Sequence, residues 1–508
     1  MKSSARTRGR PERQWRQHAI LRAALVCVLC VGAVGAHGRS QPESPDESLR
    51  RIIATVDAGQ FALAERRIDD LLAQVPADAP LARDIAFERE RMRRIRLDFP
   101  LDAAAVQRRL REQVPDYRDA DFERWDAAGL LEKQVIDGDT FYFKSAVSNL
   151  FRLDAEAAAR RSAAFAPAPD GPLYALHPYH AALRRAALAA NASHALPQRV
   201  RVTYTLTVDP DAAPAGSTLR AWLPFPRAIA GQQDHIRLLA STPADARIAP
   251  EATLQRTAYL ERTAVAGQPT EFSIRYEVTL SGQYHAIDPE RVTPSPSTAE
   301  LAEFTAERPP HIVFTPAMRA FSERVVGDET NPAHIARKLF EAVDRIPWAV
   351  AREYSTLSNI GDYALHAGHA DCGQQTLLLM TLLRLNGIPA RWQSGWEFFG
   401  DGYDSMHDWG WLYLAPHGWV PMDVTRGLLA SDDPALRWFY LGGLDGYRIA
   451  FNDDYARDFD PPKRHPRSET VDSQRGEVEW DGGNLYFDQW DYNFAWEPLP
   501  APDAAAAR

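Results

Sequence analysis

The stretch from Asp371 to Gly387 is difficult to fold as anything other than a buried helix. Asp371 is a favourable N-cap, a largely apolar run follows it, and Asn386-Gly387 supplies a stop signal. Cys372 therefore falls in the first turn, at the positive end of the helix dipole, where the pKa of a thiol is lowered towards neutrality. A cysteine that served only the core would be expected in the middle of the apolar face. The sequence thus predicts a reactive thiol.

The other two cysteines, Cys27 and Cys30, lie in an N-terminal segment typical of a secretory signal. Basic residues precede an uncharged apolar run at residues 23–36, which ends in small residues. We therefore predict a signal peptide at residues 1–36 and export to the periplasm or beyond. Contact with a membrane is expected only if that segment stays uncleaved. In the mature chain Cys372 would be the lone cysteine, unable to form an internal disulfide.

A chain of 508 residues is expected to form several domains. After a polar linker at residues 37–47, apolar residues recur at helical spacing through residues 48–195, where Asp137-Gly138 indicates one β-hairpin. From residue 197 the period changes to two. Alternating strands separated by turn residues then predict an antiparallel β domain, sandwich-like, over residues 197–290.

The C-terminal part of the chain is the richest in aromatic residues. Ten of the 13 tryptophans fall from Trp348 onward, so the densest aromatic packing is expected there. Helices and strands alternate over residues 309–460, which we assign to the domain that contains Cys372. Residues 461–508 are polar and proline-rich but carry several rings, and we expect this tail to pack on the core.

Composition narrows the range of partners. The formal net charge is −10. The sequence contains no long run of like charge of the kind that forms an interaction tail. Nucleic-acid binding, which needs a basic surface, is therefore not expected. The sequence gives no prediction of the oligomeric state.

A second pattern places a histidine and a carboxylate on one hairpin. Residues 406–414 predict a strand, the next four a turn, and residues 419–425 the returning strand. His407 shares a strand face with two tryptophans, and antiparallel pairing can bring it and Asp423 to one edge of the hairpin. An imidazole held by a carboxylate in apolar surroundings is the partner that a thiolate nucleophile needs.

The order of these motifs resembles the bacterial transglutaminase-like superfamily. The resemblance covers about residues 340–430 and rests on four fragments: Cys372-Gly373-Gln374 opening an apolar helix, Arg384-x-Asn386-Gly387-Ile388-Pro389-Ala390-Arg391, His407-x-Trp409, and Gly418-Trp419-Val420-Pro421-Met422-Asp423. It implies a papain-like core with Cys372 as nucleophile, His407 as base and Asp423 orienting the histidine. It also implies an oxyanion hole built from the backbone N–H of the nucleophile and one upstream side chain, Trp348 or Tyr354.

The expected fold class is therefore α+β, with a papain-like transglutaminase core preceded by a mainly helical domain and an antiparallel β-sandwich-like domain. The expected activity is that of an exported cysteine enzyme that acts on amide bonds of a protein or peptide substrate through a thioester, followed by transfer to an amine or hydrolysis. Protease or amidase activity falls within this range. The chemistry needs no cofactor.

Three alternatives accompany this interpretation. His366-x-x-His369-x-x-Cys372, with His407, contains zinc-ligand residue types, although its spacing is not a common zinc pattern and a helix begins inside it. Asp408 is the next carboxylate to consider beside the histidine, although it points to the opposite face of the strand. Finally, the domain could be a catalytically inactive scaffold that binds protein or peptide in the cell envelope.

Overall fold

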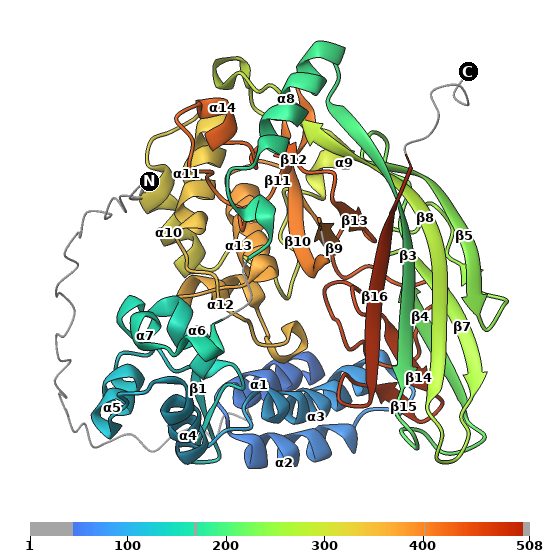
Figure 1. Cartoon of the computed structure of the whole chain (residues 1–508). Helices are drawn as coiled ribbons and strands as arrows, with labels where there is room; N and C mark the ends of the chain where they lie inside the picture. The colour runs from blue at the N-terminus through green and yellow to red at the C-terminus, as the bar shows by residue number, and fades with distance from the viewer. Residues whose placement is uncertain (1–43, 167–169, 401, 501–508) are drawn as a thin grey trace, which may run out of the picture. The chain divides into compact units, whose positions relative to one another are not determined.

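A helical region forms the N-terminal part of the described chain. The computed structural model describes residues 44–166, 170–400 and 402–500, so the predicted signal peptide lies outside the described residues. The helices of this region are α1 (Pro45–Asp57), α2 (Phe61–Leu72), α3 (Pro80–Asp98), α4 (Ala103–Gln113), α5 (Asp119–Ala127), α6 (Ala146–Leu153) and α7 (Ala155–Arg160) (Figure 1).

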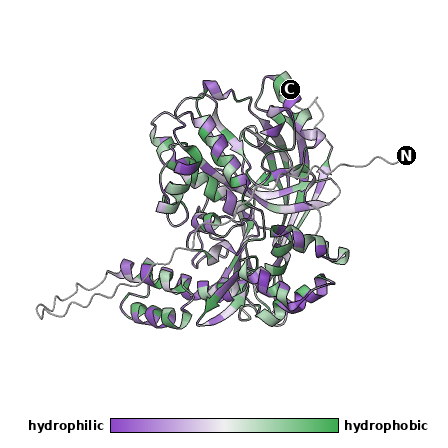
Figure 2. Cartoon of the chain, turned by 90° about the vertical axis from the view of Figure 1, so that its left-hand side faces the viewer, coloured by the Kyte–Doolittle hydropathy of each residue, from purple (hydrophilic) through white to green (hydrophobic). Residues whose placement is uncertain are grey.

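A hairpin interrupts these helices where the sequence predicts it. Strands β1 (Lys133–Ile136) and β2 (Asp139–Tyr142) pair antiparallel around Asp137 and Gly138. Both turn residues have positive φ, 51° and 100°, a backbone conformation that suits an Asp-Gly pair in a two-residue hairpin turn. The helices of the chain carry both hydrophobic and hydrophilic residues along their length (Figure 2), as expected of helices that bury one face.

Two antiparallel sheets follow and share one hydrophobic core. One has the order β12-β8-β3-β16, with β5 also paired to β8, and the other has the order β15-β14-β4-β7-β6. Their strands are β3 (His194–Val208), β4 (Thr218–Pro224), β5 (Gln233–Thr242), β6 (Arg247–Ile248), β7 (Thr257–Thr263), β8 (Thr270–Tyr284), β12 (Gly443–Leu444), β14 (Glu477–Trp480), β15 (Gly483–Leu485) and β16 (Trp490–Leu499). The alternation that predicted β3 is visible in its burial, since every second residue from Val200 to Val208 faces the core. Helix α8 (Pro178–Ala190) leads into this strand.

The region that contains Cys372 is a sheet packed against helices. The sheet order is β11-β10-β9-β13, from β9 (Ala390–Phe399), β10 (Tyr403–Leu414), β11 (Gly418–Met422) and β13 (Arg448–Ala450). Helices α10 (Pro316–Val326), α11 (Pro332–Asp344), α12 (Ile360–His366) and α13 (Cys372–Leu385) complete the core, with short helices α9 (Ala299–Ala302) and α14 (Pro434–Arg437) nearby in sequence. The fold class is therefore α+β, as predicted, with a helical region, antiparallel sheets and a core of sheet and helices around Cys372.

The C-terminal segment is more deeply integrated than a packed tail. Strands β14 and β15 extend one sheet of the sandwich, and β16 pairs with β3 along its length in the other. Trp396 of β9 stacks on Phe494 of β16, with ring centroids 4.4 Å apart. The aromatic residues of this segment therefore fill the core between the sandwich and the sheet that carries the site.

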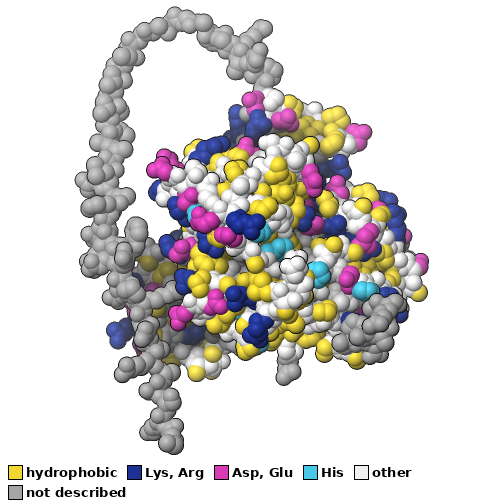
Figure 3. Space-filling view, turned by 90° about the horizontal axis from the view of Figure 1, so that it is seen from above, with side chains coloured by type: hydrophobic (Ala, Val, Ile, Leu, Met, Phe, Trp, Pro, Cys, Tyr) yellow, Lys and Arg dark blue, Asp and Glu magenta, His cyan; other side chains and the backbone are white. Residues whose placement is uncertain are grey.

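The helical region contacts the loop that precedes α12. Asn149 and Val350 exchange two hydrogen bonds, of 2.9 and 3.0 Å, and the buried carboxylate of Asp98 accepts from the backbone N–H of Glu353. This loop lines the cavity described below, so the helical region helps to fix one wall of the site. On the face seen in Figure 3 basic and acidic side chains are interspersed. No helix within the described ranges is long and apolar enough to cross a membrane.

Candidate active site

Cys372 is the first residue of α13, as the sequence predicts. The Asp371 side chain accepts from the backbone N–H of Gln374 at 2.9 Å, and the Gln374 side chain accepts from the backbone N–H of Asp371 at 3.3 Å. This reciprocal capping box fixes the start of the helix and hence the position of the thiol. Gly387, with a φ of 72°, lies just beyond the helix C-terminus.

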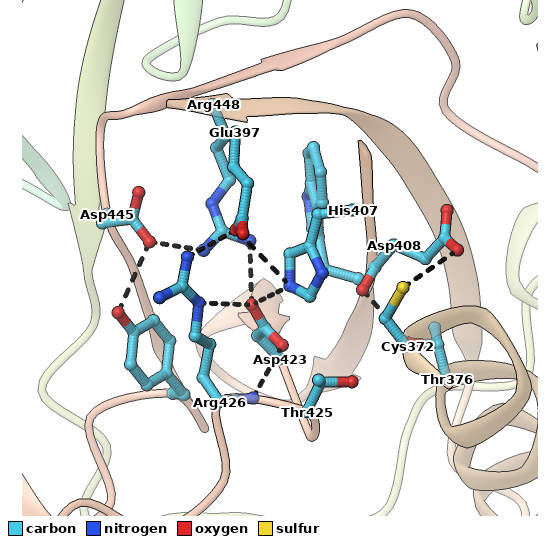
Figure 4. A network of polar contacts seen from close by, with 12 residues as sticks. Cys372, Thr376, Glu397, His407, Asp408, Asp423, Thr425, Arg426, Asp445 and Arg448 are labelled. Atoms are coloured by element: carbon cyan, nitrogen blue, oxygen red, sulfur yellow. Dashed lines mark hydrogen bonds and ion pairs between the residues drawn. The ribbon is translucent and has the colours of Figure 1, made fainter. Parts of the chain in front are cut away.

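His407 and Asp423 come together across the hairpin of β10 and β11. His407 lies on β10, and Asp423 directly follows β11; His407 Nε2 and Asp423 Oδ2 are 2.8 Å apart. Both side chains are at most 1% exposed. In Figure 4 the second ring nitrogen of His407, Nδ1, is turned towards the side on which Cys372 lies.

A cluster of buried charges surrounds Asp423, and we call it the ion cluster. Arg448 Nη1 donates to Asp423 Oδ2 at 2.9 Å, the same oxygen that contacts the imidazole. Arg448 also bonds Asp445, and Arg426 bonds Glu397, whose Oε2 is 4.0 Å from His407 Nε2. The members of the ion cluster are Glu397, His407, Asp423, Arg426, Asp445 and Arg448 (Figure 4). Burial opposes ionisation of Asp423, but the charges of His407, Arg448 and Arg426 lower its pKa below the usual range.

The thiol faces a different set of groups. Cys372 Sγ donates to Asp408 Oδ2 at 3.5 Å, and Tyr354 Oη donates to the same carboxylate oxygen at 3.0 Å. Tyr354 also contacts both oxygens of Asp371, at 2.9 and 3.0 Å. Within the described part of the chain no hydrogen bond joins the thiol to His407. Asp408, which the sequence treats as a secondary candidate, is thus the carboxyl in contact with the sulfur.

These surroundings change the expected ionisation of the thiol. Burial and, next, the charges of Asp408 and Asp371 raise the pKa of Cys372 well above its usual value. The sequence predicted the opposite direction, a lowered pKa, from the helix terminus and an imidazolium neighbour. Two carboxyls beside the sulfur and exclusion of water outweigh a dipole whose effect on a nearby charge is about 0.3–2 kcal/mol. Burial also raises the pKa of Asp371, to about 7.

Cys372 opens onto a cavity of about 300 Å³. Its walls come from the loop before α12, the start of α13, strand β10 and the C-terminal segment. Trp348 and Tyr354, the two candidates for the upstream oxyanion donor, both line it. The Tyr354 hydroxyl hydrogen is already directed to carboxylates, whereas the indole of Trp348 stacks against the Arg152 guanidinium, 4.4 Å from the ring centre.

The histidines of the zinc alternative are directed to other partners. His366 Nδ1 contacts the backbone carbonyl of Asp362 at 2.8 Å, and His369 Nε2 lies 3.6 Å from Glu132. Among residues 44–166, 170–400 and 402–500, no group of three or more histidine, cysteine, aspartate or glutamate side chains is arranged to hold a metal ion.

With this geometry in view, the chain can be compared with known proteins. Residues 319–424 match the transglutaminase-like superfamily. This transglutaminase-like region spans α10 to β11 and contains Cys372, His407 and Asp423 in the order that the motifs predict. Comparison with curated protein sequences gives no significant match.

Two solved structures resemble the chain. One, described as a candidate cysteine protease from Cytophaga hutchinsonii, is 12% identical, with a TM-score of 0.41, and the match covers 61% of this chain and 93% of that one. The other is the periplasmic domain of TgpA from Pseudomonas aeruginosa, 16% identical, with a TM-score of 0.25, covering 48% of this chain and 91% of that one.

Several residues of the site escaped prediction from the sequence. Arg426, Arg448 and Asp445 of the ion cluster carry no motif of their own, and Asp472 and Gln474 come from the segment expected to be a tail. The signal that could have pointed to them is the aromatic content of residues 461–508, which indicates that this segment is packed rather than free.

Proposed function

We propose that this chain is an exported transglutaminase-like cysteine enzyme that acts on amide bonds of proteins or peptides through a thioester. The observation that carries the proposal is the 2.8 Å contact between His407 and Asp423, in a region that matches the superfamily and in which Cys372 begins α13 beside a cavity. Nucleophile, imidazole and orienting carboxylate are the parts that covalent acyl transfer requires.

The proposed reaction has two stages. His407 takes the thiol proton as the Cys372 sulfur attacks the amide carbonyl and a C–S bond forms, and the C–N bond breaks as the leaving amine takes that proton from His407. Water or a second amine then gives a proton to His407 and attacks the thioester, the C–S bond breaks, and the sulfur recovers the proton from His407. Asp423, held by Arg448, stabilises the charged imidazole, and the backbone N–H of Cys372 with Trp348 or Tyr354 would stabilise the oxyanion.

Export is the part of the proposal that rests on sequence alone. The basic segment and the apolar run at residues 23–36 support a cleaved signal, and secretion would leave Cys372 without a disulfide partner in the mature chain. The peptide substrate would then be met in the cell envelope.

A second candidate function is a scaffold that binds peptides without turning them over. It is favoured by one observation: burial of Cys372 and the carboxyls of Asp408 and Asp371 raise the pKa of the thiol well above its usual value. A protonated thiol is a weak nucleophile unless another group removes the proton.

Incubation of residues 37–508 with a library of glutamine- and asparagine-containing peptides separates the two functions. Mass spectrometry of the peptides, with and without added amine, detects hydrolysis and transfer. We expect products with the native chain and none with Cys372→Ala. Peptides that bind both proteins equally and emerge unchanged would contradict the enzyme and support the scaffold.

A further inference from the structure

The cavity beside Cys372 has an acidic lining. Among the residues that the structure describes, five carboxyls and two guanidiniums line it: Glu353, Asp371, Asp408, Glu469, Asp472, Arg352 and Arg475. A cavity whose walls carry more carboxyls than cations attracts a positively charged ligand, provided that the carboxyls are not neutralised within the protein. The partners of each charged group therefore decide what the cavity can bind.

The two guanidiniums of the lining are already engaged. Arg475 lies 2.8 Å from Glu353 and 2.7 Å from Glu469, so its charge is shared between these two carboxylates. Arg352 lies over the ring of Phe99, 4.9 Å from its centre. In the part of the chain that the structure describes, neither guanidinium forms an ion pair with the other three carboxyls of the lining.

Two of these three carboxyls are held by neutral donors. Asp371 accepts from Tyr354 Oη and from the backbone N–H of Gln374, and Asp408 accepts from Tyr354 Oη and Gln474 Nε2. Such donors satisfy the oxygen atoms but supply no full positive charge. Burial accordingly raises the pKa of Asp408 well above its usual value and that of Asp371 to about 7.

Asp472 is the carboxyl with an acceptor atom to spare. This residue is 2% exposed and lines the cavity, and its Oδ2 is buried without a hydrogen-bond donor among residues 44–166, 170–400 and 402–500. Arg467 donates to the backbone carbonyl oxygens of Asp472 and Arg457, and its Nε lies 3.9 Å from Glu477. Burial raises the pKa of Asp472 despite the nearby Arg467. An unpaired buried acceptor is unfavourable, which indicates a ligand that supplies the missing donor.

The size and the apolar part of the lining indicate the shape of that ligand. A volume of about 300 Å³ is at the small end of the range for ligand pockets and suits one side chain. Trp348, Val350 and Met406 add apolar surface. Lysine and arginine combine an apolar stem with a charged head, so their methylenes can pack on this surface while the head reaches the carboxyls.

We propose that this cavity binds a lysine or arginine side chain of the substrate, on the residue whose main-chain carbonyl Cys372 attacks, and that Asp472 determines this specificity. The inference rests on the proposed function and narrows it to peptide bonds that follow a basic residue. Because Cys372 lines the same cavity, the side chain nearest to it belongs to the residue that becomes the acyl group. Its ammonium or guanidinium donates to Asp472 Oδ2 and brings a positive charge to Asp371 and Asp408.

Calorimetry tests the binding step without turnover. Cys372→Ala is titrated with Nα-acetyl-lysine methylamide and with the norleucine analogue, which has the same carbon chain and lacks only the ammonium. We expect the lysine ligand to bind about 10- to 100-fold more tightly, the range for hydrogen bonds to a charged group. Adding Asp472→Asn should reduce this ratio at least fivefold. Adding Asp404→Asn, which changes an exposed carboxylate on β10, should leave it unchanged.

Acylation measures the same preference in the reaction. The burst of nitrophenolate from the p-nitrophenyl esters of Nα-acetyl-lysine and Nα-acetyl-norleucine is followed with the native chain, Asp472→Asn and Asp404→Asn. The ratio of the two rates within each protein cancels any difference in folded fraction. We expect the native chain to favour the lysine ester about 10- to 100-fold and Asp472→Asn to lose most of that preference.

The two experiments separate the inference from the proposed function. Equal affinities and equal rates for the lysine and norleucine compounds would overturn the inference, and this comparison needs no variant of Asp472. A preference that persists in Asp472→Asn would overturn the role of that residue. Preferential binding of the lysine ligand without acylation of Cys372 by either ester would support the cation site and overturn the proposed function.

Discussion

His407 and Asp423 are diagonal neighbours on one face of the β10–β11 hairpin. Met422 pairs with Gly410, so the residue after β11 continues opposite Trp409, two positions from His407. A diagonal pair in an antiparallel ladder lies within reach of longer side chains, and here the side chains meet at 2.8 Å. The imidazole and the carboxylate therefore meet although the two residues lie at unequal distances from the turn.

Replacing Asp423 tests how much its contact with His407 contributes to turnover. Asp423→Asn should reduce turnover by about 10- to 10³-fold, less than the loss of about 10⁴ for the equivalent change in a serine triad, because a cysteine enzyme depends less on the carboxylate. Steady-state turnover of a peptide substrate, with Asp404→Asn as control, measures the effect. An unchanged rate would make Asp423 a structural residue of the ion cluster only.

Gly373 is a position where any side chain should damage the site. A Cβ there would lie 2.0 Å from Tyr354 Oη and 2.6 Å from Asp408 Oδ2. Gly373→Ala should therefore displace both groups, lower the free energy of unfolding by about 1–3 kcal/mol and depress acylation. Gly483→Ala, where nothing lies within 4 Å of the added Cβ, is the matched control for urea unfolding and activity. Equal behaviour of the two variants would contradict the packing around Cys372.

The dependence of stability on pH should carry a contribution from Asp371. Burial raises its pKa to about 7 in the folded chain, whereas an aspartate in an unfolded chain titrates at about 4. Between these values the folded state binds more protons, so this group makes the free energy of unfolding fall as pH rises from about 4 to about 7.

Urea unfolding across that pH range measures the contribution. Asp371→Asn keeps an N-cap and should flatten the decline, whereas Asp102→Asn, at the exposed N-cap of α4, should leave it unchanged. The same slope in Asp371→Asn as in the native chain would show that Asp371 is ionised in the folded state at acidic pH.

Export makes a prediction about the mature N-terminus. Protein recovered from an envelope extract should begin near His37, because the apolar run at residues 23–36 ends in small residues suited to signal cleavage. Intact-mass measurement decides this. A chain that retains Met1 and sediments with membranes would contradict cleavage and indicate an anchor.

Local signals predicted the transglutaminase-like region well. The N-cap at Asp371, the apolar run behind it and the turn between β10 and β11 act over a few residues, and each is found where the sequence places it. Contacts between distant segments could not be predicted in this way. Asp472 is 100 positions from Cys372, and Arg448 is 25 from Asp423. Only the folded chain therefore reveals that the first two line one cavity and that the last two belong to the ion cluster.

The same distinction explains the reversed pKa of Cys372. A helix terminus is a local feature that the sequence displays, and it favours a thiolate. Burial of the thiol beside Asp408 and Asp371 depends on how β10 packs on α13. This burial has a larger effect on the pKa of the thiol than the helix terminus has. The predicted direction of the pKa shift of Cys372 was therefore wrong, because the packing that raises this pKa cannot be read from the spacing of residues in the sequence.

Formation of an acyl-enzyme on Cys372 can be detected by intact-protein mass spectrometry. The mature chain is mixed with p-nitrophenyl acetate, quenched in acid within the burst, and digested to locate the label. We expect one acetyl group per chain, attached to Cys372 and absent from Cys372→Ala. A label on another residue, or none while the native chain remains folded, would contradict it.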